Sequence, residues 1–288
     1  MLNFKSIEKK LSQKRWRLID SGAADSYFNM AADEYLMHFS KEEEIPTLRF
    51  YEWKPSGISV GYNQKVKLFL DVDYINSCGF QWVRRITGGE TVFHHNDQTY
   101  SVAIPANMLP QPKTKSLYFF IHMMIAEALK RLDIDVDDLL PSNRNPNIKF
   151  YNCFVSKSDY ELSWKRRKFV GSAQKRSKGV FLQHGAIMLD VDYFHLDRIF
   201  LKEGNLPIRG IEKLKENLCG LREICGEVID RKRLKTEITR TFERYGIKFI
   251  KKPFSKEEID EINLIKNSKY SLPEWNEEGI IRDKKEDG

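Results

Sequence analysis

Two adjacent glycines, Gly88 and Gly89, restrict the fold of this chain more than any other feature of its sequence. They directly follow a strand-like run, FQWVRRIT, which begins at Phe80. Glycines after such a run usually mark a place where the backbone comes very close to another group. That group can be a nucleotide phosphate, an acyl chain or a neighbouring strand. The choice decides whether the protein uses ATP, and the glycine pair alone leaves it open.

Strand-like segments recur through the first two thirds of the chain. They alternate apolar and polar residues or are rich in β-branched and aromatic residues, and most are bounded by turn residues. They span residues 15–22, 47–53, 57–62, 80–87, 99–105, 160–164, 167–176 and 180–190. Together they predict a β-sheet core.

Segments with apolar residues at helical spacing accompany these strands. They span residues 27–41, 117–132, 233–246 and 255–270, and Ser255 with Glu258 forms a capping box at the start of the last one. We therefore predict an α+β fold, in which a mixed or antiparallel β-sheet core is flanked by helices. Residues 1–200 form the expected core, with its motifs from about residue 20. Residues 201–288 form a C-terminal helical segment packed on that core, with a disordered tail.

Composition limits the classes of protein and partner. The N-terminus lacks the apolar stretch of a secretory signal, and no apolar run approaches the ~18 residues of a membrane span, so a cytoplasmic location is expected. The 48 Lys and Arg residues exceed the 41 Asp and Glu residues, giving a net charge of +7. This excess suggests an acidic partner. Because the basic residues are scattered apart from WKRRK, an acidic protein fits as well as a nucleic acid.

The four cysteines, Cys78, Cys153, Cys219 and Cys225, show no metal-binding pattern. None forms a C-x-x-C pair, and no cluster of cysteine and histidine has the spacing of a zinc site. We expect free thiols, mostly buried, and no metal. Whether one of them is a nucleophile needs a local argument.

Three motifs resemble those of the biotin/lipoate protein ligase superfamily in their order and spacing. They are RRITGGETVFH followed by TYS, KFVGSAQKR, and LQHGAIMLD, and the resemblance runs from about Asp20 to the PEWN near the C-terminus. It implies the α+β catalytic fold of that superfamily. Two chemistries occur there. Lipoate ligases activate a free acid with ATP, whereas octanoyltransferases pass an octanoyl group from acyl carrier protein to a lysine of a lipoyl domain without ATP.

Cys153 resembles the nucleophile of the octanoyltransferases found in many Gram-positive bacteria, because it lies seven residues before the Tyr160 of a Y-E-L strand. Without the resemblance, a buried structural thiol would be the better interpretation. Lys168 resembles the catalytic lysine of both branches. An ammonium at ~4 Å would favour a thiolate by up to ~4 kcal/mol at an effective dielectric of ~20, and desolvation would oppose it. Without the resemblance, Lys168 would be a solvated lysine at a strand edge.

The resemblance also implies a set of acyl-binding residues. They are Arg85, Thr87, Gly88, Gly89, His94, Gly171, Ser172, Ala173, His184 and Gly185. The chain departs from the ligase pattern at Glu90 and Thr91, where small or glycine residues are common. A glutamate would repel a phosphate, and a missing glycine removes backbone freedom that a phosphate-binding loop needs. Both departures favour acyl transfer, and Gly88 and Gly89 are then expected to lie against the acyl chain.

The sequence therefore predicts an octanoyltransferase that works through a cysteine thioester and needs no cofactor. Its expected partners are octanoyl-acyl carrier protein as donor, and lipoyl domains of 2-oxoacid dehydrogenases or the glycine-cleavage H protein as acceptor, with no nucleic acid or membrane. One alternative is an ATP-dependent lipoate ligase, which would need ATP and magnesium. The other is a binding protein without enzymatic activity, which would form no acyl adduct.

Overall fold

A six-stranded mixed sheet forms the centre of the molecule. The computed structural model describes residues 4–109, 114–137, 139, 161–177, 179–201 and 210–280. The strand order is β11-β1-β2-β6-β10-β9. Strand β1 pairs in parallel with β11 and β2, whereas β6 pairs with β2 and β10, and β10 with β9, in antiparallel fashion. The bounds are β1 Arg15–Ala24, β2 Thr47–Trp53, β6 Asp97–Pro105, β9 Val170–Ser177, β10 Val180–Met188 and β11 Lys248–Lys251.

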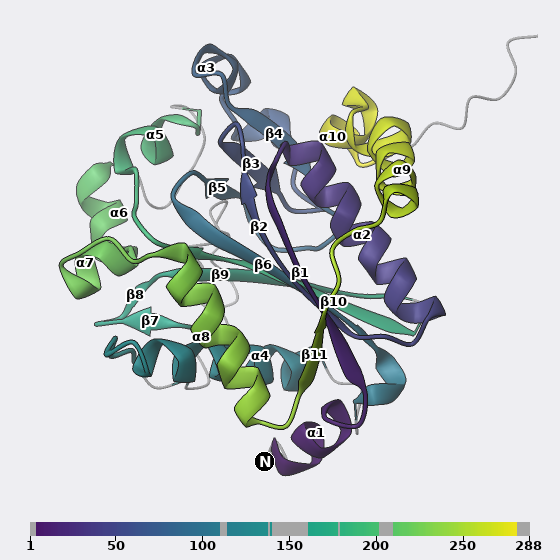
Figure 1. Ribbon diagram of the computed structural model, residues 1–288. Helices are drawn as coiled ribbons and strands as arrows, with labels where there is room; N and C mark the ends of the chain where they lie inside the picture. Colours follow the sequence, from purple (N-terminus) through teal and green to yellow (C-terminus); the bar gives the residue numbers. More distant parts are fainter. Residues whose placement is uncertain are drawn as a thin grey trace, which may run out of the picture.

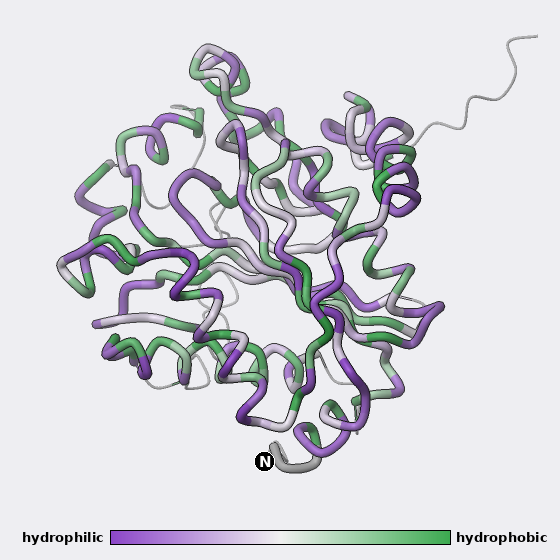
Figure 2. The backbone as a smooth tube through the Cα atoms, viewed as in Figure 1, coloured by the Kyte–Doolittle hydropathy of each residue, from purple (hydrophilic) through white to green (hydrophobic). Residues whose placement is uncertain are grey.

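Helices cover both faces of this sheet, so its central strands β6 and β10 are buried along their whole length. Helices α4 (Thr114–Lys130) and α8 (Arg231–Arg244) lie on one face, and α2 (Ser26–Glu42) lies on the other (Figure 1). Because side chains alternate along a strand, Val102 and Ile104 pack toward α4, while Ala103 packs toward α2. The strands at the centre of the sheet carry hydrophobic stretches, drawn green in Figure 2, between paler and purple ones. The predicted α+β fold is confirmed.

A second, three-stranded sheet stands beside the main one and carries the glycine pair. Its order is β4-β3-β5, and the loop from Arg85 to Thr91 joins β4 to β5. The bounds are β3 Gly57–Val60, β4 Gln81–Arg84 and β5 Val92–His94. Two further short strands form a hairpin before β9, namely β7 Ser163–Trp164 and β8 Arg167–Lys168. The sequence indicated strands at β3, β4, β7 and β8, but it indicated neither β5 nor the division of these strands into separate sheets.

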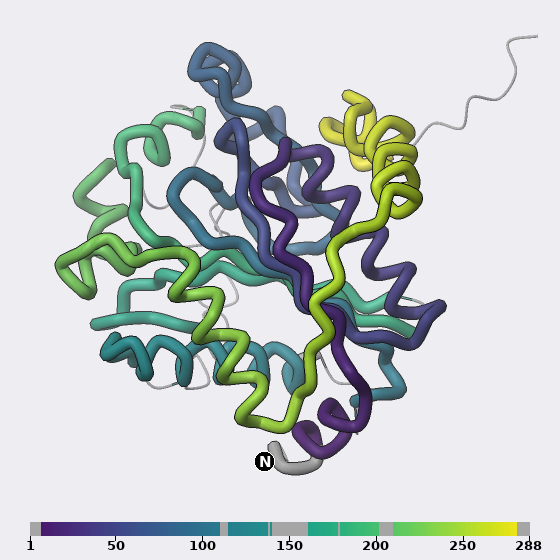
Figure 3. The backbone as a smooth tube through the Cα atoms, viewed as in Figure 1, coloured from purple at the N-terminus to yellow at the C-terminus, as the bar shows by residue number. Residues whose placement is uncertain are grey.

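The C-terminal part of the chain adds a strand to the main sheet as well as helices. Strand β11 runs beside the N-terminal strand β1, although more than 200 residues separate them, as the green-to-yellow and purple tubes show (Figure 3). The strand was not expected in this segment. The remaining helical elements are α1 Phe4–Leu11, η1 Val66–Leu68, α3 Val72–Ser77, η2 Ala106–Met108, α5 Tyr193–Arg198, α6 Ile211–Asn217, α7 Leu221–Cys225, α9 Lys256–Ile265, η3 Lys266–Tyr270 and α10 Pro273–Glu278.

Within the described ranges, none of the helices combines the length and the apolar character that a transmembrane span requires. The predicted capping box is present at the start of α9, where Ser255 and Glu258 satisfy each other's backbone N–H groups. The predicted nucleophile Cys153, Tyr160 and the C-terminal tail from residue 281 lie outside the described residues.

Candidate active site

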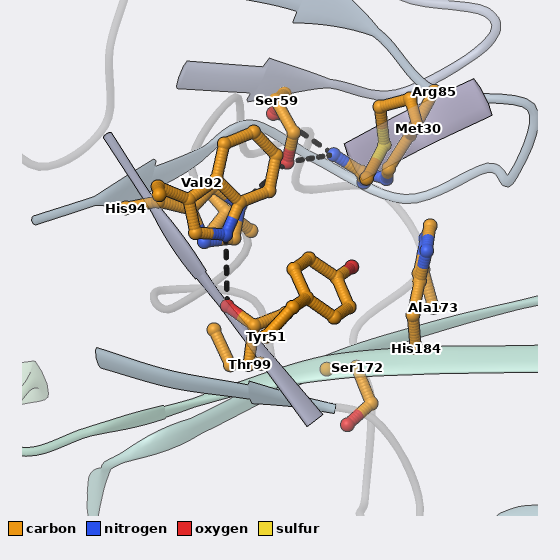
Figure 4. A pocket seen from close by; sticks show the side chains of 14 residues that line it. Met30, Tyr51, Ser59, Arg85, Val92, His94, Thr99, Ser172, Ala173 and His184 are labelled. Carbon is orange, nitrogen blue, oxygen red and sulfur yellow. Dashed lines mark hydrogen bonds between the residues drawn. The ribbon is translucent and has the colours of Figure 1, made fainter. Parts of the chain in front are cut away.

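A narrow, partly enclosed pocket lies between the main sheet and the small sheet. Most of the predicted acyl-binding residues meet there although they come from distant segments (Figure 4). Those that line it are Arg85, His94, Gly171, Ser172, Ala173, His184 and Gly185. The remaining lining residues are Met30, Tyr51, Trp53, Ser59, Val92, Thr99 and Ala186, so large apolar and aromatic side chains form much of the wall.

Strands β9 and β10 form one wall of the pocket, where Ser172 pairs with Gly185 and Ala173 with His184. A Cβ atom at Gly185 would lie 2.4 Å from the Ser172 hydroxyl and 2.8 Å from the Tyr100 ring. Glycine is therefore required for the close packing that joins the hydroxyls of Ser172 and Tyr100 at 2.8 Å. His122 of α4 also bonds to the Ser172 hydroxyl at 2.9 Å, which fixes that side chain from the α4 face.

Of the two adjacent glycines, Gly89 packs against the segment that follows β3. A Cβ atom at Gly61, just after β3, would lie only 1.8 Å from the carbonyl oxygen of Gly89. Gly89 itself has a φ of +84°, which favours glycine. Thr87, Gly88 and Gly89 are not among the residues that line the pocket. The loop lies behind Arg85, and acyl binding by these three residues stays a prediction.

Arg85 holds this loop through its guanidinium group. Its Nε donates to the Thr87 hydroxyl at 3.0 Å, and its Nη2 donates to the carbonyls of Gly88 and Glu90 at 2.8 and 2.7 Å. Its Nη1 donates to the carbonyl of Ser59 at 2.9 Å and faces the Ser59 hydroxyl at 3.3 Å. Arg85 thus ties the loop to β3 while its side chain lines the pocket.

The neighbouring Arg84 points the other way and is structural. Its Nη1 donates to three carbonyls of the loop after β3, including that of Tyr62 at 2.7 Å. Its Nε and Nη2 donate to carbonyls of α10, including that of Glu277 at 2.8 Å. Burial lowers the pKa of Arg84. Arg85 therefore lines the pocket, whereas Arg84 holds the C-terminal helix α10 in place.

His94 belongs to a chain of hydrogen bonds along one wall of the pocket. Its Nδ1 lies 2.9 Å from Asp97 Oδ2, and its Nε2 lies 2.9 Å from the Ser59 hydroxyl. The Trp53 indole stacks on the imidazole at a centroid distance of 3.9 Å. Burial lowers the pKa of His94, against the opposing effect of Asp97, so the imidazole is neutral at neutral pH.

His184 forms a second chain on the other side of Arg85. Its Nδ1 lies 2.8 Å from Asp33 Oδ2, and its Nε2 lies 2.7 Å from the Thr87 hydroxyl. Asp33 is also bound by Arg49 and by the Tyr51 hydroxyl, both at 2.9 Å. Burial alone would raise the pKa of Asp33, but the bond from His184 and the charge of Arg49 lower it.

Sequence reasoning did not identify Ser59, Asp97 or Asp33 as parts of the site. The NMAADE segment that contains Asp33 was noted, and it was interpreted mainly as structure. Serine and aspartate within strands carry no local signature, so Ser59 and Asp97 emerge only once the two sheets are placed side by side.

Lys168 lies on β8, three residues before the pocket residue Gly171. Its Nζ forms an ion pair with Glu161 at 2.6 Å, and the two side chains are only 6% and 8% exposed. Lys168 is therefore a buried ammonium group just before β9, and it is not among the residues that line the pocket.

Two of the three cysteines that the structure describes are poor nucleophiles. Burial raises the pKa of Cys219 to about 12 and also raises the pKa of Cys225, so both thiols are protonated at neutral pH. Cys78 lies just after α3, and none of the three lines the pocket.

Comparisons with known proteins agree with one another. Residues 25–243 match the family model described as the lipoyl protein ligase A/B catalytic domain. The chain is similar to octanoyltransferase LipM of Bacillus subtilis (strain 168), with 34% identity over 92% of this chain and 99% of the relative. It is also similar to octanoyltransferase LipM of Staphylococcus aureus (strain NCTC 8325 / PS 47), with 35% identity over 90% of this chain and 97% of the relative.

Solved structures share the fold. A lipoate-protein ligase A bound with ATP superposes with a TM-score of 0.75 and 21% identity, over 92% of this chain and 99% of that chain. A putative lipoate protein ligase from T. acidophilum with bound lipoic acid gives a TM-score of 0.74 and 21% identity, over 92% of this chain and all of that chain. At this identity the likeness concerns the fold alone.

Proposed function

This chain belongs to the lipoyl protein ligase A/B family, and we infer that within it the chain is an octanoyltransferase, which moves an octanoyl group from acyl carrier protein to a lysine of a lipoyl domain or glycine-cleavage H protein. The observation that carries this inference is similarity to octanoyltransferases over nearly the whole length of both chains, at 34% and 35% identity. The enzyme is an octanoyl-[acyl carrier protein]:protein N-octanoyltransferase.

The proposed reaction has two steps, with Cys153 as the nucleophile. In the first, the thiolate attacks the donor thioester, the new C–S bond forms, and the donor thiol is released. In the second, the acceptor amine attacks the S-octanoyl enzyme, a C–N bond forms, and the Cys153 thiolate leaves. The raised pKa of Cys219 and of Cys225 supports Cys153, since it removes two competing thiols.

Lys168 is proposed to stabilise the thiolate and the developing oxyanion. The observation that supports this role is its burial, because an ammonium in a poorly hydrated place acts on nearby charge more strongly than one in water. Glu161 holds the ammonium in place.

The pocket between the two sheets is the proposed site of the octanoyl chain. Met30 of α2, Tyr51 and Trp53 of β2, and Val92 of β5 supply apolar surface from three different elements. At about 0.8 kcal/mol per buried methylene, an octanoyl chain gains roughly 5 kcal/mol on binding. A binding gain of this size would give the enzyme a preference for medium-length acyl groups over acetyl.

The arginine that lines the pocket fits a neutral thioester better than a phosphate, because its guanidinium already donates to backbone carbonyls of the loop and of β3. Glu90 adds an acidic residue where ligases commonly have a small one. The ATP-dependent ligase is therefore the second candidate, supported by the fold that it shares with this chain.

Intact-mass measurement after mixing with octanoyl-acyl carrier protein tests the proposal. The wild-type protein should gain one octanoyl group without ATP, and Cys153→Ala should gain none. Free octanoate with ATP and magnesium should leave the lipoyl domain unmodified. An adduct on Cys78, Cys219 or Cys225 would contradict the assignment of Cys153, and efficient ATP-dependent modification would establish the ligase.

A further inference from the structure

We propose that the hairpin of β7 and β8 is the surface on which the acidic carrier protein docks when it delivers the octanoyl group. The tip of this hairpin presents Lys165 and Arg166, which belong to the basic run WKRRK. The inference rests on the proposed function, because it concerns the donor of that reaction. It adds a surface for the donor protein to the pocket between the two sheets.

The turn of this hairpin has an unusual sequence. Trp164 pairs with Arg167, so the loop consists of Lys165 and Arg166 alone, and these two residues have φ values of +49° and +67°. A two-residue turn with positive φ at both positions favours Asn-Gly or Asp-Gly. The conformation of the turn therefore does not explain two basic residues at this place. Local preferences of this kind are commonly broken at functional sites.

Contacts with the rest of the chain hold the turn in one conformation. The Asp137 carboxylate accepts from the backbone N–H of Lys165 at 2.9 Å and from that of Arg166 at 2.8 Å. The next residue, Arg167, forms an ion pair with Glu223 of α7 at 2.9 Å. A surface that is ordered before binding loses less conformational entropy when a partner docks.

The side chains of Lys165 and Arg166 carry the charges that this hairpin offers to a partner. Both are exposed, and neither forms an ion pair within the part of the chain that the structure describes. The basic residues that follow them differ, because Arg167 is paired with Glu223 and Lys168 with Glu161. The hairpin therefore exposes two unpaired positive charges side by side at its tip.

The tip is close enough to the pocket for a protein docked there to deliver an acyl group. Gly171 lines the pocket and comes five residues after Arg166, so the chain between them spans at most about 18 Å. A protein interface covers about 800 Å² on each partner, which is roughly 30 Å across. A protein docked on the hairpin, at the left of Figure 1, can therefore also cover the start of β9.

The charge of the tip fits the donor better than the acceptor or a nucleic acid. The thioester of the donor is neutral, whereas the acceptor brings a lysine that is cationic at neutral pH and is repelled by a basic surface. A nucleic acid needs a longer basic track, because its binding neutralises several phosphates. The neighbouring cations Lys215 and Arg222 are instead paired with carboxylates.

A variant that replaces the two basic residues with the preferred turn sequence tests the inference. Lys165→Asn/Arg166→Gly should unfold at the same urea concentration as the wild type or at a higher one. We expect its kcat/KM for octanoyl-acyl carrier protein to fall about tenfold at low salt, and this difference to vanish near 1 M salt, where the attraction is screened. Hydrolysis of a small octanoyl thioester and kcat/KM for the lipoyl domain should change by less than about twofold.

Lys251→Asn/Lys252→Asn is the matched control. It also removes two exposed positive charges, but from β11 and the residue after it, at the opposite edge of the main sheet from β9. Lysines on an edge strand prevent pairing with other chains, which accounts for their presence there. The control should keep its kcat/KM for octanoyl-acyl carrier protein within about twofold of the wild-type value.

Equal losses in the two variants, or an unchanged kcat/KM in the hairpin variant, would overturn the inference. A loss confined to kcat/KM for the lipoyl domain would overturn it in favour of docking by the acceptor. If the wild-type protein takes no octanoyl group from acyl carrier protein, the proposed function fails and the inference fails with it. Intact-mass measurement of the wild type identifies that case separately.

Discussion

Gly61 and Gly89 approach so closely that no other residue fits at position 61. The Cβ atom of an alanine there would lie 1.8 Å from a backbone oxygen, which cannot rotate away. We expect Gly61→Ala to lower the free energy of unfolding by about 1–3 kcal/mol, the usual cost of overpacking, as measured by urea unfolding. Gly88→Ala is the matched control, since its Cβ would meet nothing within 4 Å, and it should cost less than about 0.5 kcal/mol. Equal losses would mean that the loop is not held by this contact.

Gly61 and Gly89 also show what the sequence around a single residue can and cannot predict. The doubled glycine in the sequence was expected to lie against the acyl chain, which stays a prediction. The structure shows a close backbone approach at Gly89, to Gly61 of a neighbouring segment. The partner, Gly61, directly follows β3, which pairs in parallel with β4, and the register of that pairing cannot be read from either strand alone. Ser59 and Asp97 could not be identified from the sequence for the same reason, because each belongs to the site only through its hydrogen bond with His94.

At the scale of elements, helix α2 is fastened to β2 and β10 by a buried ionic network around Asp33. The folded protein lowers the pKa of Asp33, so this carboxylate contributes stability above its unfolded pKa of about 3.9 that is lost as pH falls below that value. Asp33→Asn should cost about 3–5 kcal/mol at neutral pH, because it leaves Arg49 buried without its partner. It should also make the loss of stability below pH 4 shallower.

Urea unfolding between pH 2 and pH 7 checks both expectations. Asp20→Asn is the control, since Asp20 forms an exposed ion pair with Lys235 and its loss should cost no more than about 1 kcal/mol. Parallel pH profiles for Asp33→Asn and the wild type would show that the network contributes nothing to acid unfolding.

Helices with apolar residues at helical spacing could be predicted from the sequence. Elements held in place by residues distant in the chain could not. Helices α2 and α4 carry clear amphipathic patterns, and each was expected close to its observed range. Strand β11 is four residues long and largely exposed, so its sequence KFIK carries little pattern, and it exists because β1 offers a free edge. Likewise, α10 is held by Arg84, whose partners lie more than 190 residues away.

For the whole molecule, the excess of seven positive charges bears on how the enzyme meets its protein substrates. Acidic carrier proteins would be steered to it, and this effect weakens as the Debye length falls from ~10 Å at 0.1 M salt to ~3 Å at 1 M. We therefore expect kcat/KM for octanoyl-acyl carrier protein to fall as salt rises. Hydrolysis of a small octanoyl thioester should hardly change, because no charged partner is steered. Both assays use the proposed nucleophile Cys153, so a difference between their salt dependences reports on docking of the carrier protein and not on the chemical step. An equal response to salt would show that the net charge has no part in partner binding.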